Sequence, residues 1–280
     1  MDTLRDDEAM PISLFSEYTG IPQSTLRFYD KHGVLTPAFR SDGNARRYSP
    51  FQIILAKAVR VLSQMKVPLE TITSHFSERT PESMLNLMSA QTFSIMREIE
   101  RLSTAQAVLT TYFNLIQSGL SADTETIAVA DMDEMRFSLG APNSVTGDPS
   151  FYSSFVRFCS GAEDYGINLN FPVGGYSTSF KDFRSSTVVP EYFASITPFG
   201  NRIRPAGKYI VGYVRGYYGN VGDVTRRMLA FAAANGFATD GPVYQIYLQD
   251  ELSQRDPTQY LLRITTPAKR LSRSRTRQAR

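Results

Sequence analysis

A heptad repeat of apolar residues over 85–116 constrains the fold of this chain most strongly. The positions at alternating steps of three and four are Leu85, Met88, Thr92, Ile95, Ile99, Leu102, Gln106, Leu109, Phe113 and Ile116. All but Thr92 and Gln106 are apolar, and no glycine or proline interrupts the run before Gly119. This spacing predicts a coiled-coil helix over 81–118, roughly 50 Å long at 1.5 Å per residue. Because one helix cannot bury its own seam, we expect a homodimer. The alternative, a core helix of the following domain, would normally be shorter.

Residue types that form disulfides or bind metals are scarce. The 280 residues include one cysteine, two histidines and no tryptophan. A single cysteine forms no internal disulfide, and zinc or other transition-metal sites draw on several Cys or His, so we predict no metal and no cofactor. The N-terminus is acidic, and no stretch approaches the ~20 apolar residues of a membrane span. We therefore expect a cytoplasmic protein without a signal peptide.

The net charge of +3 hides a segregation along the chain. Residues 11–80 carry nine Lys/Arg against five Asp/Glu, or +4, whereas residues 121–267 carry 15 acids against 12 bases, or −3. The last thirteen residues hold six bases and no acid. A basic N-terminal segment before an acidic, aromatic-rich body is typical of a polyanion-binding module joined to another domain.

Residues 11–80 have the pattern of a helix-turn-helix. A helix over 14–19 ends at Gly20, Pro22 suits the first turn of a second helix over 23–32, and Gly33 ends that helix. Asp42-Gly43-Asn44 then signals a hairpin turn with arginines on both arms, which is typical of a wing that lies against phosphates. Apolar spacing predicts further helices over 50–65 and from Pro68.

Beyond a linker over 119–123, the pattern predicts an α+β domain. Expected strands are 126–129, 135–139, 174–180, 192–196, 209–214, 243–248 and 260–265. Expected helices are 149–162 and 221–234, which end in Asp164-Tyr165-Gly166 and Ala234-Asn235-Gly236. The two glycines lie 236 − 166 = 70 residues apart, and two strands follow each helix. We therefore predict duplicated strand-helix-strand-strand units within a domain over 124–268, followed by a basic tail over 269–280.

The N-terminal segment resembles the MerR family of transcription regulators. The resemblance rests on Thr19-Gly20-Ile21-Pro22, on Thr25-Leu26-Arg27-Phe28-Tyr29-Asp30, on Gly33-Val34-Leu35 with Pro37, and on Arg46-Arg47-Tyr48-Ser49. It implies a winged helix-turn-helix DNA-binding domain over 11–80 and a dimerisation helix after it. Phe28 departs from the tyrosine usual there, and Ala45-Arg46-Arg47 departs from the usual wing pattern.

The C-terminal region is similar to the GyrI-like effector-binding domains of multidrug-sensing members of that family. The similarity rests on Gly216-Tyr217-Tyr218, on Asn235-Gly236 and on the stretch from Gly241 to Leu248. That family commonly places a glutamate, the counter-ion for cationic drugs, where this chain has Gln245 and near Arg263. Another acid, such as Glu191 or Asp133, is then needed for a cationic ligand; a neutral ligand needs none.

Candidate site residues follow from these patterns. The N-terminus of a recognition helix meets base edges and arginines meet phosphates, which selects the DNA-binding set. It comprises Gln23, Ser24, Thr25, Arg27, Phe28, Tyr29, Arg40, Arg46, Arg47, Tyr48 and Lys66. Aromatic rings in an acidic domain favour a flat lipophilic ligand. That set comprises Tyr152, Tyr192, Phe193, Tyr213, Tyr218, Tyr244, Tyr247 and Tyr260. We expect Cys159 to be a packed thiol, His32 to cap a helix end and His75 to be a surface residue.

Together these observations predict a ligand-responsive transcription activator. Its partners would be promoter DNA, a second copy of itself, RNA polymerase and a lipophilic effector. The resemblance implies that the dimer kinks and untwists an overlong promoter spacer. Two alternatives are an enzyme that acts on a lipophilic compound and a DNA-binding protein whose C-terminal domain docks a protein partner. The C-terminal domain has no histidine and no Ser-His-Asp set, so we predict that it is not an enzyme.

Overall fold

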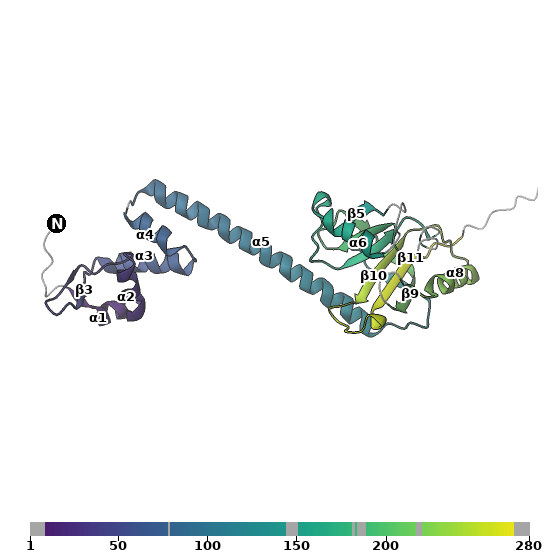
Figure 1. Ribbon diagram of the computed structural model, residues 1–280, viewed down its shortest axis with the longest axis horizontal. Coiled ribbons are helices and arrows are strands. Elements are labelled where there is room, and N and C mark those ends of the chain that lie inside the picture. Colours follow the sequence, from purple (N-terminus) through teal and green to yellow (C-terminus); the bar gives the residue numbers. More distant parts are fainter. Residues whose placement is uncertain are drawn as a thin grey trace, which may run out of the picture. The chain divides into compact units, whose positions relative to one another are not determined.

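The chain forms two compact units, Met1–Arg101 and Leu102–Arg280, in a computed structural model (Figure 1). The structure describes residues 9–77, 79–143, 151–180, 183, 189–216 and 220–271. Tyr218 and most of the basic tail, 272–280, lie outside these ranges. Within them, no helix combines the length and the apolar character needed to cross a membrane.

The first unit packs short helices around a small sheet. Its elements are β1 (Met10–Pro11), α1 (Ile12–Thr19), α2 (Gln23–Lys31), β2 (Phe39–Arg40), β3 (Arg46–Tyr48), α3 (Gln52–Gln64) and α4 (Leu69–Ser77). The sheet order is β1-β3-β2, and all pairs are antiparallel. Strand β1 has only two residues and was not predicted. The hydrophobic core of the first unit contains Phe15, Leu26 and Ile72, each fully buried.

The turn between α1 and α2 requires a glycine. Gly20 has a φ of 65°, a left-handed conformation that L side chains rarely adopt. A Cβ at this position would lie 2.5 Å from Nη1 of Arg60, which donates a hydrogen bond to the carbonyl of Thr19 at 3.0 Å. The arginine of α3 therefore holds the end of α1 against the core.

Helix α5 (Pro81–Leu120) has 40 residues. Thr80 and Ser83 exchange hydrogen bonds at its start, because each hydroxyl accepts from the backbone N–H of the other residue, at 3.0 and 3.2 Å. Its heptad side chains stay exposed along the helix: Leu85 is 65% exposed, Ile99 57% and Leu109 71%. Such a row of apolar side chains on a single helix is typical of a seam that a second helix covers.

The second unit is an antiparallel sheet with helices on one face. Its elements are β4 (Ala128–Met132), β5 (Met135–Pro142), α6 (Phe151–Ser160), β6 (Val173–Ser177), β7 (Tyr192–Ile196), β8 (Arg202–Arg204), β9 (Gly207–Arg215), α8 (Val224–Asn235), β10 (Val243–Gln249) and β11 (Leu261–Pro267). The strand order is β4-β9-β11-β10-β6-β7-β5-β8. Residues of α6 and α8 pack on one face, while Leu115 of α5 joins the cluster on the other.

The two halves of this sheet have corresponding strand orders when each is read from the middle of the sheet to its edge: β10 corresponds to β6, β11 to β7, and β9 to β5. From β10 the order is β10-β11-β9-β4, and from β6 it is β6-β7-β5-β8. The glycines beneath the two helices correspond as well. A Cβ on Gly140 would meet Phe158 of α6 at 2.6 Å, and one on Gly212 would meet Val224 of α8 at 2.8 Å. These correspondences support an internal duplication.

The predicted strand boundaries differ from the observed ones in places. The strand expected at 126–129 begins and ends later, the one expected at 174–180 ends at Ser177, and β8 was not predicted. In β8 two arginines flank one isoleucine, so its three residues show no apolar pattern that a sequence could reveal.

Candidate DNA-binding surface and ligand pocket

The first turn of α2 presents the predicted base-reading residues. Gln23, Ser24 and Thr25 open the helix directly after Pro22, and Ser24 is exposed. Arg27 is exposed one turn later, and its Nη2 donates to Oε1 of Gln23 at 3.5 Å. These side chains therefore lie at the N-terminal end of one short helix, where a recognition helix meets base edges.

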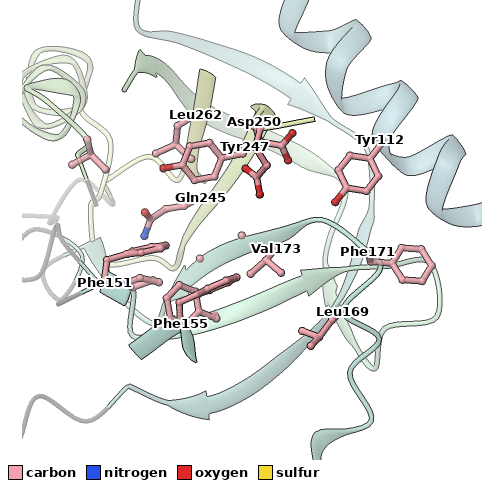
Figure 2. A pocket seen from close by; sticks show the side chains of 16 residues that line it. Tyr112, Phe151, Phe155, Leu169, Phe171, Val173, Gln245, Tyr247, Asp250 and Leu262 are labelled. Carbon is pink, nitrogen blue, oxygen red and sulfur yellow. The ribbon is translucent and has the colours of Figure 1, made fainter. Parts of the chain in front are cut away.

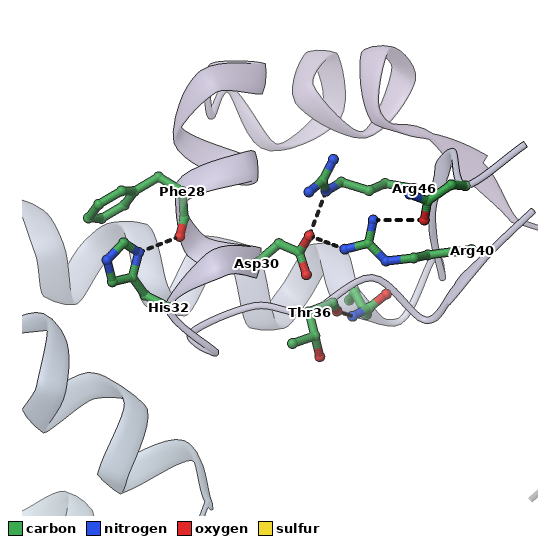
Figure 3. Close-up of polar contacts among 8 residues, drawn as sticks. Phe28, Asp30, His32, Thr36, Arg40 and Arg46 are labelled. Carbon is green, nitrogen blue, oxygen red and sulfur yellow. Dashed lines mark hydrogen bonds and ion pairs between the residues drawn. The ribbon is translucent and has the colours of Figure 1, made fainter.

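Asp30 joins α2 to the hairpin of β2 and β3, which we call the wing (Phe39–Tyr48). Its Oδ2 accepts from Nη2 of Arg40 and from Nε of Arg46, both at 2.6 Å (Figure 3). The carboxylate side chain is only 8% exposed, whereas that of Arg40 is 39% exposed. One buried carboxylate thus orients the two wing arginines, which the sequence analysis predicted to contact DNA phosphates.

Two residues of the predicted DNA-binding set are buried, which corrects their assignment as contacts. Tyr48 is fully buried and stacks on Phe15, with ring centroids 4.3 Å apart. Tyr29 is 7% exposed, and its hydroxyl lies 3.2 Å from Oγ of Ser63. Both rings fill the core, so they support the surface from behind. Arg47 is partly buried, with its Nε enclosed.

Phe28 and Lys66 remain accessible. Phe28 is 48% exposed and stands against the ring of His32, whose Nδ1 lies 2.9 Å from the carbonyl of Phe28 and caps this helix end as predicted (Figure 3). Lys66 is exposed after α3. His75, in contrast, is half-buried, and its Nδ1 lies 3.0 Å from Oγ of Ser83, so the prediction of a surface residue was wrong.

An aromatic cavity of about 150 Å³ lies on the helix-covered face of the second unit. Figure 2 shows Phe151 and Phe155 of α6 on one wall and Gln245 and Tyr247 of β10 on the opposite wall. Behind the two phenylalanines, the Phe193 ring lies 5.4 Å from each of theirs. The middle of the sheet and helix α6 together form this cavity. We call it the aromatic pocket.

Carboxylates lie at one end of the aromatic pocket. Asp250 and Glu251 follow β10 directly, and Tyr112 of α5 lies beside them (Figure 2). Burial raises the pKa of Tyr112 to about 12, helped by the negative charges of Asp250 and Glu251. Burial also raises the pKa of Asp250, with Glu251 adding to the effect. The pocket therefore offers aromatic faces and negative charge, which suits a cation.

The predicted ligand set is divided between the two faces of the sheet, because alternate residues of a strand point to opposite sides. Phe193 and Tyr247 line the aromatic pocket, and Tyr260 packs on Tyr247 at 6.4 Å. Tyr192 and Tyr244 line a different cavity, on the opposite face of the sheet. Tyr213 packs on that opposite face as well, in the cluster that contains Leu115. Tyr152 is 69% exposed on α6. The prediction that Tyr192, Tyr213 and Tyr244 share one pocket with Phe193 and Tyr247 was therefore wrong.

The acids suggested from the sequence do not line the aromatic pocket either. Glu191 accepts from the N–H and the hydroxyl of Thr178 at 2.7 and 2.8 Å, and Asp133 lines a separate cavity. Sequence reasoning missed Tyr112, Asp250 and Glu251. The signal for the two acids was their position at the end of the strand that holds Gln245.

Reactive groups are few near this pocket. Cys159 of α6 is half-buried beside Phe158, and burial raises the pKa of its thiol, which disfavours a nucleophilic thiolate. Among the residues that the structure describes, no three of His, Cys, Asp and Glu are grouped so that they could hold a metal ion.

Comparison with known proteins identifies the N-terminal segment. The family model described as MerR HTH family regulatory protein matches residues 10–78. These residues form a MerR helix-turn-helix domain. A curated relative of this chain is the multidrug-efflux transporter 2 regulator of Bacillus subtilis (strain 168). The two are 24% identical over 243 residues, which cover 85% of this chain and 88% of the relative.

Solved structures of similar proteins also match this chain. The cryo-EM structure of the EcmrR–DNA complex in EcmrR-RPo matches 94% of this chain and 100% of that chain, with 15% identity and a TM-score of 0.37. The N-terminal part of MtaN, the Bacillus subtilis multidrug transporter activator, matches 40% of this chain and 99% of that chain. Its identity is 18% and its TM-score 0.33.

Proposed function

We propose that this chain is a cytoplasmic, ligand-responsive transcription activator of the MerR family that senses lipophilic compounds, neutral or cationic. The observation that carries the proposal is the aromatic pocket with Asp250 at its end, in the same chain as a MerR helix-turn-helix domain. The chain would divide into a winged helix-turn-helix over 11–80, a dimerisation coiled coil over 81–118, a GyrI-like effector domain over 124–268 and a basic tail.

The size of the aromatic pocket limits the effector. A cavity of about 150 Å³ holds roughly one benzene-sized ring. The faces of Phe151 and Phe155 suit such a ring, and the carboxylate of Asp250 suits a positive group attached to it. Gln245 presents a neutral amide in the wall, so the negative charge comes from the residues after β10.

DNA recognition would use α2 and the wing. Gln23, Ser24 and Thr25 would read bases in the major groove, while Arg27 and the wing arginines would hold phosphates. In the proposed dimer, two such units would bind a promoter and distort its spacer, so that specificity arises partly from DNA deformation. RNA polymerase would then engage both promoter elements.

Effector binding would reach the DNA-binding unit through α5. Tyr112 lines the aromatic pocket, and the same helix begins at Pro81 in the first unit. A ligand shifts such an equilibrium only when it binds the two states with different affinity. A ligand in the aromatic pocket would contact Tyr112, and through this side chain a difference in affinity would act on α5.

A matched pair of ligands tests the proposal. Phenyltrimethylammonium and its neutral isostere tert-butylbenzene are titrated into the full-length protein by calorimetry. We expect the cation to bind more tightly, and Asp250→Asn to remove the preference, whereas Asp240→Asn, an exposed acid outside the pocket, keeps it. Absence of binding by both compounds would count against an effector pocket.

An enzyme remains the second candidate class. Both histidines, His32 and His75, lie in the first unit, so acid-base chemistry at the pocket would fall to carboxylates or tyrosines. Recovery of both probe compounds unchanged after long incubation supports a sensor, and any turnover supports an enzyme. If the C-terminal domain instead docks a protein partner, we expect neither compound to compete with that partner protein for binding to the domain.

A further inference from the structure

A second cavity, of about 480 Å³, lies on the face of the sheet opposite the aromatic pocket. The end of α5 forms one wall with Asn114, Leu115 and Ser118. Two arginines, Arg204 of β8 and Arg263 of β11, lie at its base. Both belong to the sheet face that carries the Leu115 cluster of aromatic and aliphatic side chains.

Arg204 is almost completely buried, at 3% exposure. Its Nη2 donates to the carbonyl of Asp133 at 2.7 Å, whereas Nε and Nη1 have no hydrogen-bond partner. The guanidinium carbon lies 5.1 Å from the centre of the Tyr209 ring and 6.0 Å from that of Tyr244. Across the part of the chain that the structure describes, no carboxylate forms an ion pair with Arg204.

Arg263 adds a second positive charge beside the first. Burial, together with the positive charge of Arg204, lowers the pKa of its guanidinium to about 10. Tyr213 is its neighbour across the strand pair and raises the pKa of the guanidinium, while Nε of Arg263 is enclosed without a hydrogen-bond partner. Arg263, too, has no ion pair with any described acid.

Nearby acids do not neutralise these two charges. Glu134 pairs with Arg136 at 3.6 Å, and the structure gives Arg204 the carbonyl of Asp133 instead of its carboxylate. Counting Arg136, Arg204 and Arg263 against Asp133 and Glu134, the cavity walls carry a net charge of 3 − 2 = +1. Buried guanidinium groups are normally paired, because removing an unpaired charge from water is strongly unfavourable.

We propose that this cavity is a second ligand site, which binds a small organic monoanion through a carboxylate group at Arg263, with Arg204 behind it. Arginine and carboxylate form charge-assisted hydrogen bonds that match in geometry. Leu115, Ile196 and Pro198 provide apolar walls for the remainder of the ligand. Because the walls carry one net positive charge, a monoanion is preferred over a phosphate dianion.

The test uses the full-length protein and benzoate, with neutral benzamide as its isostere, in calorimetric titrations at constant ionic strength. We expect benzoate to bind saturably, benzamide to bind at least about tenfold more weakly, and inorganic phosphate to bind more weakly than benzoate. Arg263→Met should lower benzoate affinity by at least about tenfold. Arg202→Met makes the same change at an exposed position on β8 outside this cavity, and should not alter the affinity.

A second variant covers the case in which Arg263→Met does not fold. Asn114→Glu places a carboxylate on the exposed helical wall and should weaken benzoate binding severalfold while the fold is retained. Equal binding of benzoate and benzamide, or benzoate affinity that neither Arg263→Met nor Asn114→Glu reduces, would overturn the proposal. Phosphate binding as tight as that of benzoate would overturn the preference for a monoanion.

Discussion

Arg46 donates a hydrogen bond from Nε to Oδ2 of Asp30 across 2.6 Å, and this bond joins the wing to helix α2. Arg40, on the other strand of the wing, donates to the same oxygen. The side chain that lies between the two arginines is therefore an acid within a surface proposed to bind phosphates. Its role is positional, since it fixes the distance between the wing and the helix that precedes it.

Substitution of Asp30 tests this role against simple charge repulsion. Asp30→Asn removes a negative charge near DNA, yet we expect promoter affinity to fall about fivefold, or ~1 kcal/mol, because the wing must then be ordered on binding. Fluorescence anisotropy over a range of salt concentrations measures the change. Asp42→Asn, at the exposed wing turn, is the matched control and should tighten binding slightly. Tighter binding by both variants would contradict the positional role.

The hydroxyl of Tyr48 is buried without a hydrogen-bond partner. Tyr48→Phe should therefore raise the free energy of unfolding by up to about 1 kcal/mol and leave DNA affinity unchanged, because an unsatisfied buried hydroxyl costs free energy. Tyr29→Phe, which removes the contact with Ser63, should lower the free energy of unfolding by about 1 kcal/mol. Urea unfolding followed by circular dichroism compares the two. Loss of DNA affinity in Tyr48→Phe would show that this hydroxyl contacts DNA.

The exposed seam of α5 predicts the oligomeric state. Leu102 is 52% exposed in the chain by itself. Leu102→Asp should convert the dimer to a monomer in sedimentation velocity and lower promoter affinity at least tenfold, since a charge in a coiled-coil core destabilises pairing. Ser103→Asp adds the same charge next to the seam and should remain dimeric. A monomeric wild-type protein, or a dimeric Leu102→Asp variant, would refute the coiled coil.

Asp250 makes stability depend on pH. Its pKa is raised in the folded protein, so its contribution is fully present below the unfolded pKa of about 4 and is lost as the pH rises through the folded value. Asp250→Asn removes this dependence. We expect the variant to melt at a higher temperature than the wild type at pH 7, with the difference vanishing towards pH 3. Thermal melts at several pH values measure it, and identical curves for both proteins would argue against burial of the charge.

Local chemistry explains what could be predicted from the sequence. Gly20, the turn at Asp42-Gly43-Asn44 and the heptads of α5 each act within a few residues, so their spacing alone predicted α1, α2, the wing and the long helix. The aromatic pocket instead combines residues from 112 to 262, and only the strand order brings them together. Alternation along β10 puts Tyr244 and Tyr247 on opposite faces of the sheet, although the sequence analysis grouped both in one ligand set. The sequence of β10 alone does not reveal which face a helix covers.

The repeated strand order of the second unit places Gly175 opposite Gln245 in the central pair, and these residues are 70 positions apart, the same separation as the two helix-ending glycines. The two halves thus meet at corresponding positions: the first half has a glycine there, without a side chain, and the second half has the amide of Gln245. A duplicated fold can change one copy while the other maintains the sheet. The specificity of the aromatic pocket is therefore open to change by substitutions in β10 and the turn after it, with little cost to the half that supplies the phenylalanines.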